Sequence, residues 1–267
     1  MGPEDSGVSV THDYHLHSNY SDGTVLYQMV AAAADAGLEG VGVADHCNVS
    51  DRDELLRAKR EYGMNLDETH PLRREGIEGL RERFDLRVFD AVELDYAPRD
   101  EDLVAAFLDE AGFDYAIGSV HRVEGTNIQS TSPFADMSER ERSAFVDDYY
   151  ERLVELVDSE LFEIAAHVDL VERTPPLRGY TTADHHEMVA DAFARSRTVP
   201  ELNAGRVLRD YGQFHPAPDF WAALRERGFE FVAGTDAHDP GEIQKRTAEL
   251  DAYFEARDAE PVRLFEA

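Results

Sequence analysis

An alternation of strand-like and helix-like segments runs through this sequence from one end to the other. Short apolar runs predict strands, and the longer segments between them carry apolar residues at helical spacing. Because strands that alternate with helices pair in parallel through right-handed crossovers, this pattern restricts the chain to α/β architectures. The predicted strands span residues 8–14, 39–44, 87–94, 114–120, 162–166, 199–203 and 230–234, and the predicted helices span residues 24–35, 52–83, 101–110, 138–159, 183–197, 218–227 and 242–257.

The number of these units favours a closed or nearly closed barrel over an open sheet. Seven strand–helix units within 267 residues are what a seven-stranded (β/α) barrel requires. No glycine-rich dinucleotide-binding or phosphate-binding loop follows a predicted strand, which argues against a doubly wound nucleotide-binding fold. The long segment 52–83 is expected to form two helices, with a break near His70 and Pro71. Because no linker or low-complexity stretch interrupts the pattern, we expect a single domain over residues 1–267.

The charge balance excludes one class of function and indicates an environment. The chain has 56 acidic and 26 basic residues and a formal net charge of −30, with lysine only at Lys59 and Lys245. A non-specific nucleic-acid binder needs a basic face, so we expect no such activity. An acid-rich, lysine-poor surface is typical of halophilic proteins, in which concentrated salt screens the repulsion.

Other features of the sequence predict a cytoplasmic protein with no membrane partner. No apolar stretch has the roughly 20 residues of a transmembrane helix, and residues 1–10 lack the layout of a signal peptide. The single cysteine, Cys47, allows no internal disulfide and suits a reducing compartment. It directly follows His46, and we expect it to serve in packing.

Histidines and carboxylates follow the predicted strands at the point where each strand ends. The carboxyl ends of parallel barrel strands meet on one face, where such folds carry their sites. Imidazole and carboxylate are the ligands of zinc, iron and manganese, so the convergence predicts a metal centre. The residues concerned are His15, His17, Asp22, Asp45, His46, Glu93, Asp95, His121, His167, Asp169, Glu201, Asn203, Asp236 and His238.

The remaining five histidines have no role that their spacing reveals. His185 and His186 lie within a predicted helix beside acidic residues, so we expect a solvated helix face. His70 and His215 each precede a proline and are interpreted as loop residues. His12 carries no prediction.

The order of the strand-end motifs resembles that of the PHP (polymerase and histidinol phosphatase) family. The motifs read HLHSNYSDG, ADH, VELDY, GSVH, AHVD, ELN and GTDAH, and they cover nearly the whole chain. The resemblance implies a distorted seven-stranded (β/α)7 TIM-like barrel with a cluster of two or three divalent ions, Zn, Mn or Fe. It implies a first ion held by His15, His17, Glu93 and Asp236, a second reached by bridging Glu93 and completed by His121 and His167, and a third held by Asp22, His46 and His238.

Within the family, the intervals around VELDY, FDYAIGSVHRV and FEIAAHVDLVER look most like those of histidinol-phosphate phosphatases. This resemblance implies a cytoplasmic phosphomonoesterase of histidine biosynthesis that uses a metal-bridged hydroxide, with Glu93 and Asp236 in the catalytic centre. Arg122 and Arg206, which follow strand ends, are expected to bind the phosphate of histidinol phosphate. Asp13, Asp45, Asp169, Glu201 and Asn203 are expected to orient the ligands.

Two alternatives stay open. Histidinol phosphatases of this type often carry a histidine one position after Asp22, where this chain has Gly23. An aspartate at this motif is shared with family members that act as nucleotide or cyclic-phosphate phosphodiesterases. The second alternative is a non-catalytic metal-binding module like the PHP domains of some DNA polymerases, although the complete set of motifs argues against loss of function.

Overall fold

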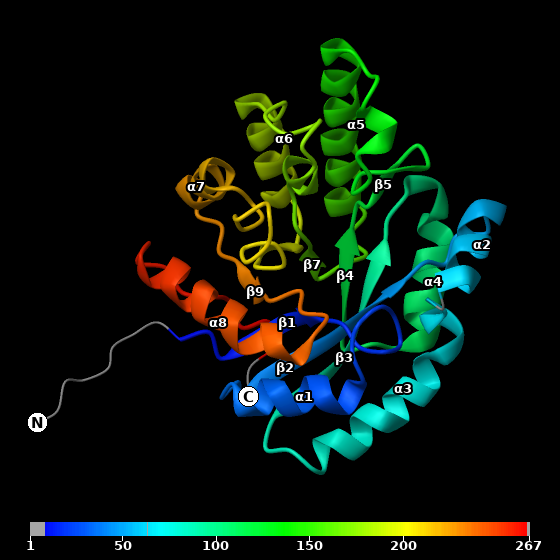
Figure 1. Ribbon diagram of the computed structural model, residues 1–267, viewed down its shortest axis with the longest axis vertical. Coiled ribbons are helices and arrows are strands. Elements are labelled where there is room, and N and C mark those ends of the chain that lie inside the picture. Colours follow the sequence, from blue (N-terminus) through cyan, green and yellow to red (C-terminus); the bar gives the residue numbers. More distant parts are fainter. Residues whose placement is uncertain (1–8, 63, 266–267) are drawn as a thin grey trace, which may run out of the picture.

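A seven-stranded parallel sheet curls into a nearly closed barrel in the computed structural model, which describes residues 9–62 and 64–265 (Figure 1). Each of the seven barrel strands pairs in parallel with the barrel strand that follows it in the chain. In spatial order the strands are β1 (His12–Leu16), β2 (Gly40–Cys47), β3 (Arg87–Asp95), β4 (Tyr115–Ser119), β7 (Ile164–Ala165), β8 (Val199–Asn203) and β9 (Val232–Gly234). The predicted fold class is therefore confirmed.

Some predictions concern residues beyond the described part of the chain. The first strand was predicted from residue 8, which lies outside the described residues, and β1 begins at His12. Most of the segment 1–10, which was predicted to lack a signal peptide, also lies outside the described residues. A single domain over residues 1–267 stays a prediction. Among the described residues, no helix combines the length and the apolar character needed to cross a membrane.

The backbone hydrogen bonds that join the end of the first strand to the segment after the last strand lie at the carboxyl end of the barrel. Beyond β9, the backbone N–H of Asp236 donates to the carbonyl of His15 at 2.6 Å, and that of His17 donates to the carbonyl of Ala237 at 2.9 Å. At the opposite end, the C-terminal segment packs under the barrel, where Leu264 N–H donates to the Tyr14 hydroxyl at 3.0 Å. The closure thus ties the chain directly beside the histidines of the first motif.

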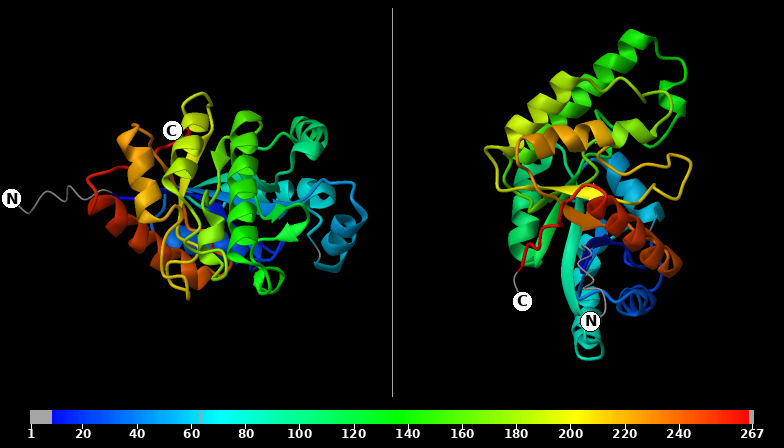
Figure 2. Two further views of the ribbon diagram at one scale, coloured as in Figure 1. Left: turned by 90° about the horizontal axis from the view of Figure 1, so that it is seen from above. Right: turned by 90° about the vertical axis from the view of Figure 1, so that its left-hand side faces the viewer.

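Eight α-helices surround this barrel in the described residues. They are α1 (Leu26–Asp35), α2 (Asp53–Tyr62), α3 (Leu66–Arg81), α4 (Glu101–Ala111), α5 (Glu139–Asp158), α6 (Ala183–Phe193), α7 (Pro218–Glu226) and α8 (Pro240–Glu255). Helices α5, α6 and α7 form one group and α8, α1 and α3 another, on opposite sides of the sheet (Figures 1 and 2). Shorter elements that the sequence did not predict are the hairpin β5 (Arg122–Val123) and β6 (Thr126–Asn127) and the 3-10 turns η1 (Pro98–Asp100), η2 (Ser132–Phe134) and η3 (Leu170–Arg173).

The predicted break near His70 and Pro71 is wrong. The two helices separate between Tyr62 and Leu66, and Pro71 lies inside α3. Proline has no N–H to donate to the carbonyl four residues earlier, which is that of Asp67. The Nδ1 atom of His70 lies 3.2 Å from this carbonyl and replaces the missing donor, so the helix continues through the proline.

The interpretation of His185 and His186 as a solvated helix face is also wrong. His185 is 7% exposed and closes a capping box with Thr182 at the start of α6, while its ring stacks on Tyr150. The ring of His186 stacks on Phe220 with 4.3 Å between centroids. Their apolar ring faces pack against neighbouring helices, and helical spacing alone did not reveal which side of α6 is covered.

A pair of glycine substitutions tests the packing of the barrel interior. A Cβ at Gly42 in β2 would lie 1.6 Å from the Tyr115 hydroxyl, whereas a Cβ at Gly79 in α3 has nothing within 4 Å. We expect Gly42→Ala to lower the free energy of unfolding by about 3 kcal/mol because the buried strands must shift. Gly79→Ala should raise it by about 0.5–1 kcal/mol through helix propensity. Chemical denaturation measures both, and a neutral Gly42→Ala would contradict the packing.

Candidate metal centre

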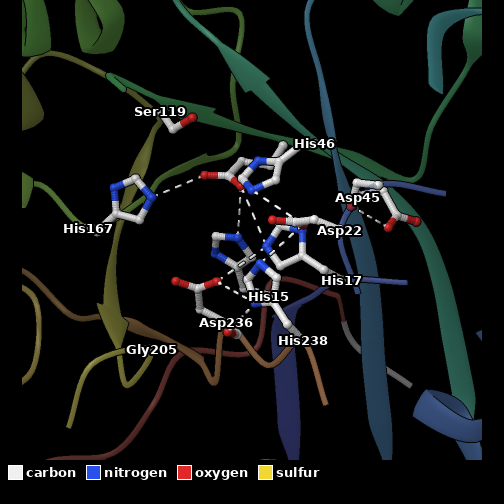
Figure 3. Close-up of polar contacts among 12 residues, drawn as sticks. His15, His17, Asp22, Asp45, His46, Ser119, His167, Gly205, Asp236 and His238 are labelled. Atoms are coloured by element: carbon white, nitrogen blue, oxygen red, sulfur yellow. Dashed lines mark hydrogen bonds and ion pairs between the residues drawn. The ribbon is translucent and has the colours of Figure 1, made fainter. Parts of the chain in front are cut away.

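Histidines and carboxylates from several strand ends converge at the carboxyl end of the barrel (Figure 3). The ring of His17, from the end of β1, lies 4.2 Å from that of His238 and 4.3 Å from that of His46. The rings of His121 and His167 lie 5.1 Å apart on the other side of the cluster. The strand ends therefore bring together residues that are more than 200 positions apart in the chain.

Glu93, at the end of β3, is the centre of this cluster. Its carboxylate is 1% exposed, and its oxygens lie within 2.7–3.6 Å of five imidazole rings. These rings belong to His15, His17, His46, His121 and His167. A buried carboxylate needs charged or polar partners, and the five imidazoles around this one supply a donor set that fits a metal centre.

A second set of contacts extends the cluster toward solvent. Asp236 Oδ1 lies 3.3 Å from His17 Nε2. Asp22 lies 3.2 Å from Nε2 of His238 and 3.8 Å from Nε2 of His46. Three groups of residues could each hold a metal ion, because within each group one ligand atom per residue lies within 4.8 Å of the others. The groups are His17 with Asp22, His46 and His238; His15 with His17 and Glu93; and His46 with Glu93 and His121.

The donor atoms in this cluster fit metal coordination better than hydrogen bonding. His15 Nε2, both ring nitrogens of His17 and Glu93 Oε2 are buried without a hydrogen-bond partner. His15 Nε2 and Glu93 Oε2 are only 3.3 Å apart, but they are not aligned as donor and acceptor. Buried polar atoms rarely lack partners, and atoms aimed at a common point are what a divalent ion requires. The residues present therefore fit a divalent metal centre.

An outer layer of hydrogen bonds fixes the imidazole rings. Nδ1 of His15 lies 2.7 Å from Glu201, and Nδ1 of His121 lies 2.5 Å from Asp95. In both rings the remaining nitrogen, Nε2, faces Glu93. Such pairs set the ring orientation and tautomer of a metal ligand.

The other residues expected in this layer have different partners. Asn203 donates to Glu201 at 3.0 Å. Asp169 lies 2.6 Å from Nδ1 of His215, which lies in the connection between β8 and α7, as the sequence indicated, but is buried there. Asp13 accepts from Thr235 and from the backbone of His15, and Asp45 accepts from residues of the loop after β1.

The electrostatics of the cluster follow from burial and from mutual contact. Burial alone would raise the pKa of Glu93, but the imidazoles of His46 and His15 hold it well below its usual range. Burial and the neighbouring His238 lower the pKa of His17 to about 4, so this ring is neutral and available as a ligand. For His46, burial would lower the pKa, yet the Glu93 carboxylate raises it to about 10. A cation that binds His46 must displace a proton, so its affinity depends on pH.

Besides the exposed Arg209, two arginines line a cavity of about 440 Å³ beside the cluster, together with Tyr211 and Thr174. One is Arg206, which the sequence indicated, and the other is Arg173 from η3, which it did not. Neither guanidinium forms a hydrogen bond or an ion pair with another described residue. Burial and the charge of Arg206 lower the pKa of Arg173 to about 10. The only indication in the sequence was that Arg173 comes six positions after His167.

A second cavity, of about 290 Å³, lies on the α2 side of the cluster. Asp22, His46 and His121 of the cluster form one of its walls, and Arg122 also lines it. Its other lining residues include Leu55, Ala58 and Met64, the carboxylate of Asp95 and the amide of Asn48. The cluster is thus flanked by a cavity rich in arginine and by a cavity whose walls combine apolar side chains and carboxylates with Lys59 and Arg122.

Comparison with known proteins finds similarity over nearly the whole chain. The model of the PHP domain matches residues 13–205. A Deinococcus radiodurans protein named "Probable histidinol-phosphatase" is 31% identical over 251 residues, which are 92% of each chain.

Two solved structures share the fold. A candidate histidinol phosphatase from Listeria monocytogenes superimposes with a TM-score of 0.72 at 18% identity, covering 87% of this chain and 97% of its own. Histidinol phosphate phosphatase from Lactococcus lactis, solved with zinc, L-histidinol and phosphate, gives a TM-score of 0.70 at 19% identity over 91% and 93% of the two chains.

Metal removal and one substitution test the cluster. Adding Zn²⁺ to the chelator-treated protein should raise its Tm, because a ligand that binds only the folded state stabilises it. Glu93→Gln should bind less zinc in elemental analysis, because the amide keeps the shape but loses the charge that cations share. His12→Asn is the control, since His12 begins β1 at the other end of the barrel. Equal zinc contents in Glu93→Gln and the unaltered protein would contradict the central role of Glu93.

Proposed function

The chain belongs to the PHP domain family, and on this premise we propose that it hydrolyses histidinol phosphate to histidinol and phosphate. It is a metal-dependent phosphoric ester hydrolase. The observation that carries the proposal is the buried Glu93 carboxylate surrounded by five imidazoles at the open end of a barrel. The activity named for the Deinococcus and Lactococcus relatives supplies the substrate.

We assign the ligands as the motif order implies. His15, His17, Glu93 and Asp236 would hold the first ion, Glu93 with His121 and His167 the second, and Asp22, His46 and His238 the third. The short distances from Glu93 to His46 and from His17 to Asp236 support ions that share ligands. We propose zinc, which the Lactococcus protein holds, while manganese and iron accept the same donors. Such ions lower the pKa of a water molecule and neutralise charge on phosphoryl oxygens.

The arginine-lined cavity would receive the phosphoryl oxygens. A guanidinium offers a planar fork of donors that matches phosphate, and Arg173 and Arg206 are both without partners in the described structure. Asp236 and Glu93 are close enough to influence the pKa of Arg173, which relates this cavity directly to the cluster. Arg122 lines the other cavity, where its guanidinium donates only to the carbonyl of Gly125 at 3.4 Å. Its contact with phosphate stays a prediction.

The second cavity would receive the alcohol that leaves. Asp22 and His46 form one of its walls, so a phosphoester bound at the cluster can extend its organic part into it. Leu55 and Ala58 of α2 offer an apolar surface to an imidazole ring, and the Asp95 carboxylate offers an acceptor to an ammonium group. Histidinol carries both groups, and simple nucleotides carry neither an ammonium group nor an imidazolyl side chain.

The departure at Asp22 and Gly23 has a structural reason. A Cβ at Gly23 would lie 2.3 Å from the backbone oxygen of His17, so this loop leaves no room for a histidine there. The Asp22 carboxylate instead reaches the site from the preceding position. Because phosphodiesterases of the family also use an aspartate, the test below includes diesters.

We also propose a cytoplasmic setting in a salt-rich cell. The support is the net charge of −30, the presence of only two lysines, and a free buried thiol at Cys47. Burial raises the pKa of this thiol, which keeps it unreactive and agrees with its predicted role in packing.

A substrate panel tests the proposed function. The zinc-loaded protein should hydrolyse histidinol phosphate with a kcat/KM at least about tenfold higher than for AMP, short oligonucleotides or a chromogenic diester. Phosphate release gives the rates, and Glu93→Gln serves as the inactive control. Preference for a diester would favour the phosphodiesterase alternative. Absence of turnover on every substrate would favour a non-catalytic module.

Arg173 can be tested separately. Arg173→Ala should lower kcat/KM for histidinol phosphate by about 10²-fold, because a charge-assisted contact to phosphate is lost. Its zinc content should not change. Arg209→Ala is the matched control, since Arg209 lines the same cavity but is exposed and pairs with Glu242. Similar losses in both variants would indicate a general effect of positive charge instead of a specific contact.

A further inference from the structure

A fully buried arginine lies just outside the metal centre. Arg73 belongs to α3 and has 0% of its surface exposed. Its guanidinium donates to Asp45 at 2.9 Å, to Asp90 at 2.6 Å, and to the carbonyl of Ala91. Burying a guanidinium is costly unless carboxylates compensate it, so the position of Arg73 is tightly coupled to these partners.

Asp45 connects this arginine to the loop that follows β1. It lies at the end of β2 beside His46 and turns away from the imidazoles (Figure 3). Its carboxylate accepts from the backbone N–H of Ser18 at 2.6 Å, from the Ser18 hydroxyl at 2.7 Å and from the Ser21 hydroxyl at 2.8 Å. With Arg73, these donors occupy the roughly four acceptor positions of a carboxylate, which leaves Asp45 no direct contact with a cation.

The loop held in this way carries Asp22. The carbonyl of Ser18 accepts from the backbone of Ser21 at 3.1 Å and of Gly23 at 2.9 Å, which winds the loop tightly. The Asp22 side chain is 41% exposed and reaches His238 Nε2 at 3.2 Å. Since burial does not hold this carboxylate, its position depends on the loop.

We propose that Arg73 is a positioning residue for the metal site formed by Asp22, His46 and His238, and that it acts through Asp45 and the loop of residues 18–23. The inference rests on the proposed function only in so far as this site holds an ion. The ligands around Glu93 have their own supports, Glu201 for His15 and Asp95 for His121. Disturbing Arg73 should therefore weaken one ion and leave the others bound.

The chain offers a matched control on the same helix. Arg74 donates to Asp90 at 2.7 Å and to the carbonyl of Gly112 at 3.2 Å, but it does not contact Asp45. A variant of Arg74 therefore disturbs α3 and Asp90 without touching the connection to the loop. Arg73→Lys keeps the buried charge but cannot reach both carboxylates with a planar fork.

The experiment measures zinc binding to the metal-free protein by calorimetric titration, with thermal unfolding of the same metal-free samples. Asp22→Asn identifies the binding event that belongs to the Asp22 site. We expect Arg73→Lys to weaken that same event by about 10–100-fold, as loss of an outer-shell partner does. Arg74→Ala should leave every binding event unchanged, even if it lowers the Tm of the metal-free protein as much as Arg73→Lys does.

Unchanged binding in Arg73→Lys, or equal weakening of all events, would overturn the proposal. If Arg73→Lys does not fold, zinc binding to Ser21→Ala tests the proposal instead. This variant removes the hydroxyl of Ser21 that donates to Asp45, and it leaves the buried core unchanged. Full affinity at the Asp22 site in that variant would count against the proposal. These measurements contain no substrate, so a failure of histidinol phosphate hydrolysis is distinguishable from a failure of this inference.

Discussion

The structure depends on one constraint, which is the burial of the Glu93 carboxylate among imidazoles. A carboxylate that is 1% exposed is tolerated only when charged or polar partners surround it. The barrel supplies these partners from the ends of four other strands, β1, β2, β4 and β7, and each must end at the right level for its side chains to reach Glu93. The closure of the barrel is placed accordingly, because His15 and His17 exchange backbone hydrogen bonds with the segment that carries Asp236.

Charge is arranged in layers around this centre. Carboxylates such as Glu201 and Asp95 orient the inner rings, and Arg73 in turn compensates Asp45 outside them. A protein with a net charge of −30 repels a phosphate monoester. Salt at physiological concentration screens this repulsion beyond about 8 Å. Attraction must therefore arise locally, from the cations that the cluster fits and from the partnerless guanidinium groups of Arg173 and Arg206.

The loop after β1 shows why this chain has a glycine at position 23 and a carboxylate at position 22. Gly23 is required where a side chain would collide with the backbone of His17, and the neighbouring aspartate reaches His238 instead. A side chain at position 22 can therefore approach His238, whereas a side chain at position 23 would collide with the backbone.

The sequence by itself determined the alternation of strands and helices, the parallel barrel and the residues at the strand ends, because periodicity and strand-end position are local properties. Only the tertiary structure decided which of these side chains meet, since the contacts of His15 with Glu93 and of His17 with Asp236 depend on how the barrel closes. It also decided the parts played by Arg173, Arg73 and His215, which no spacing indicated. A buried polar group reveals itself only by the partners that folding brings to it, and those partners are distant in the chain.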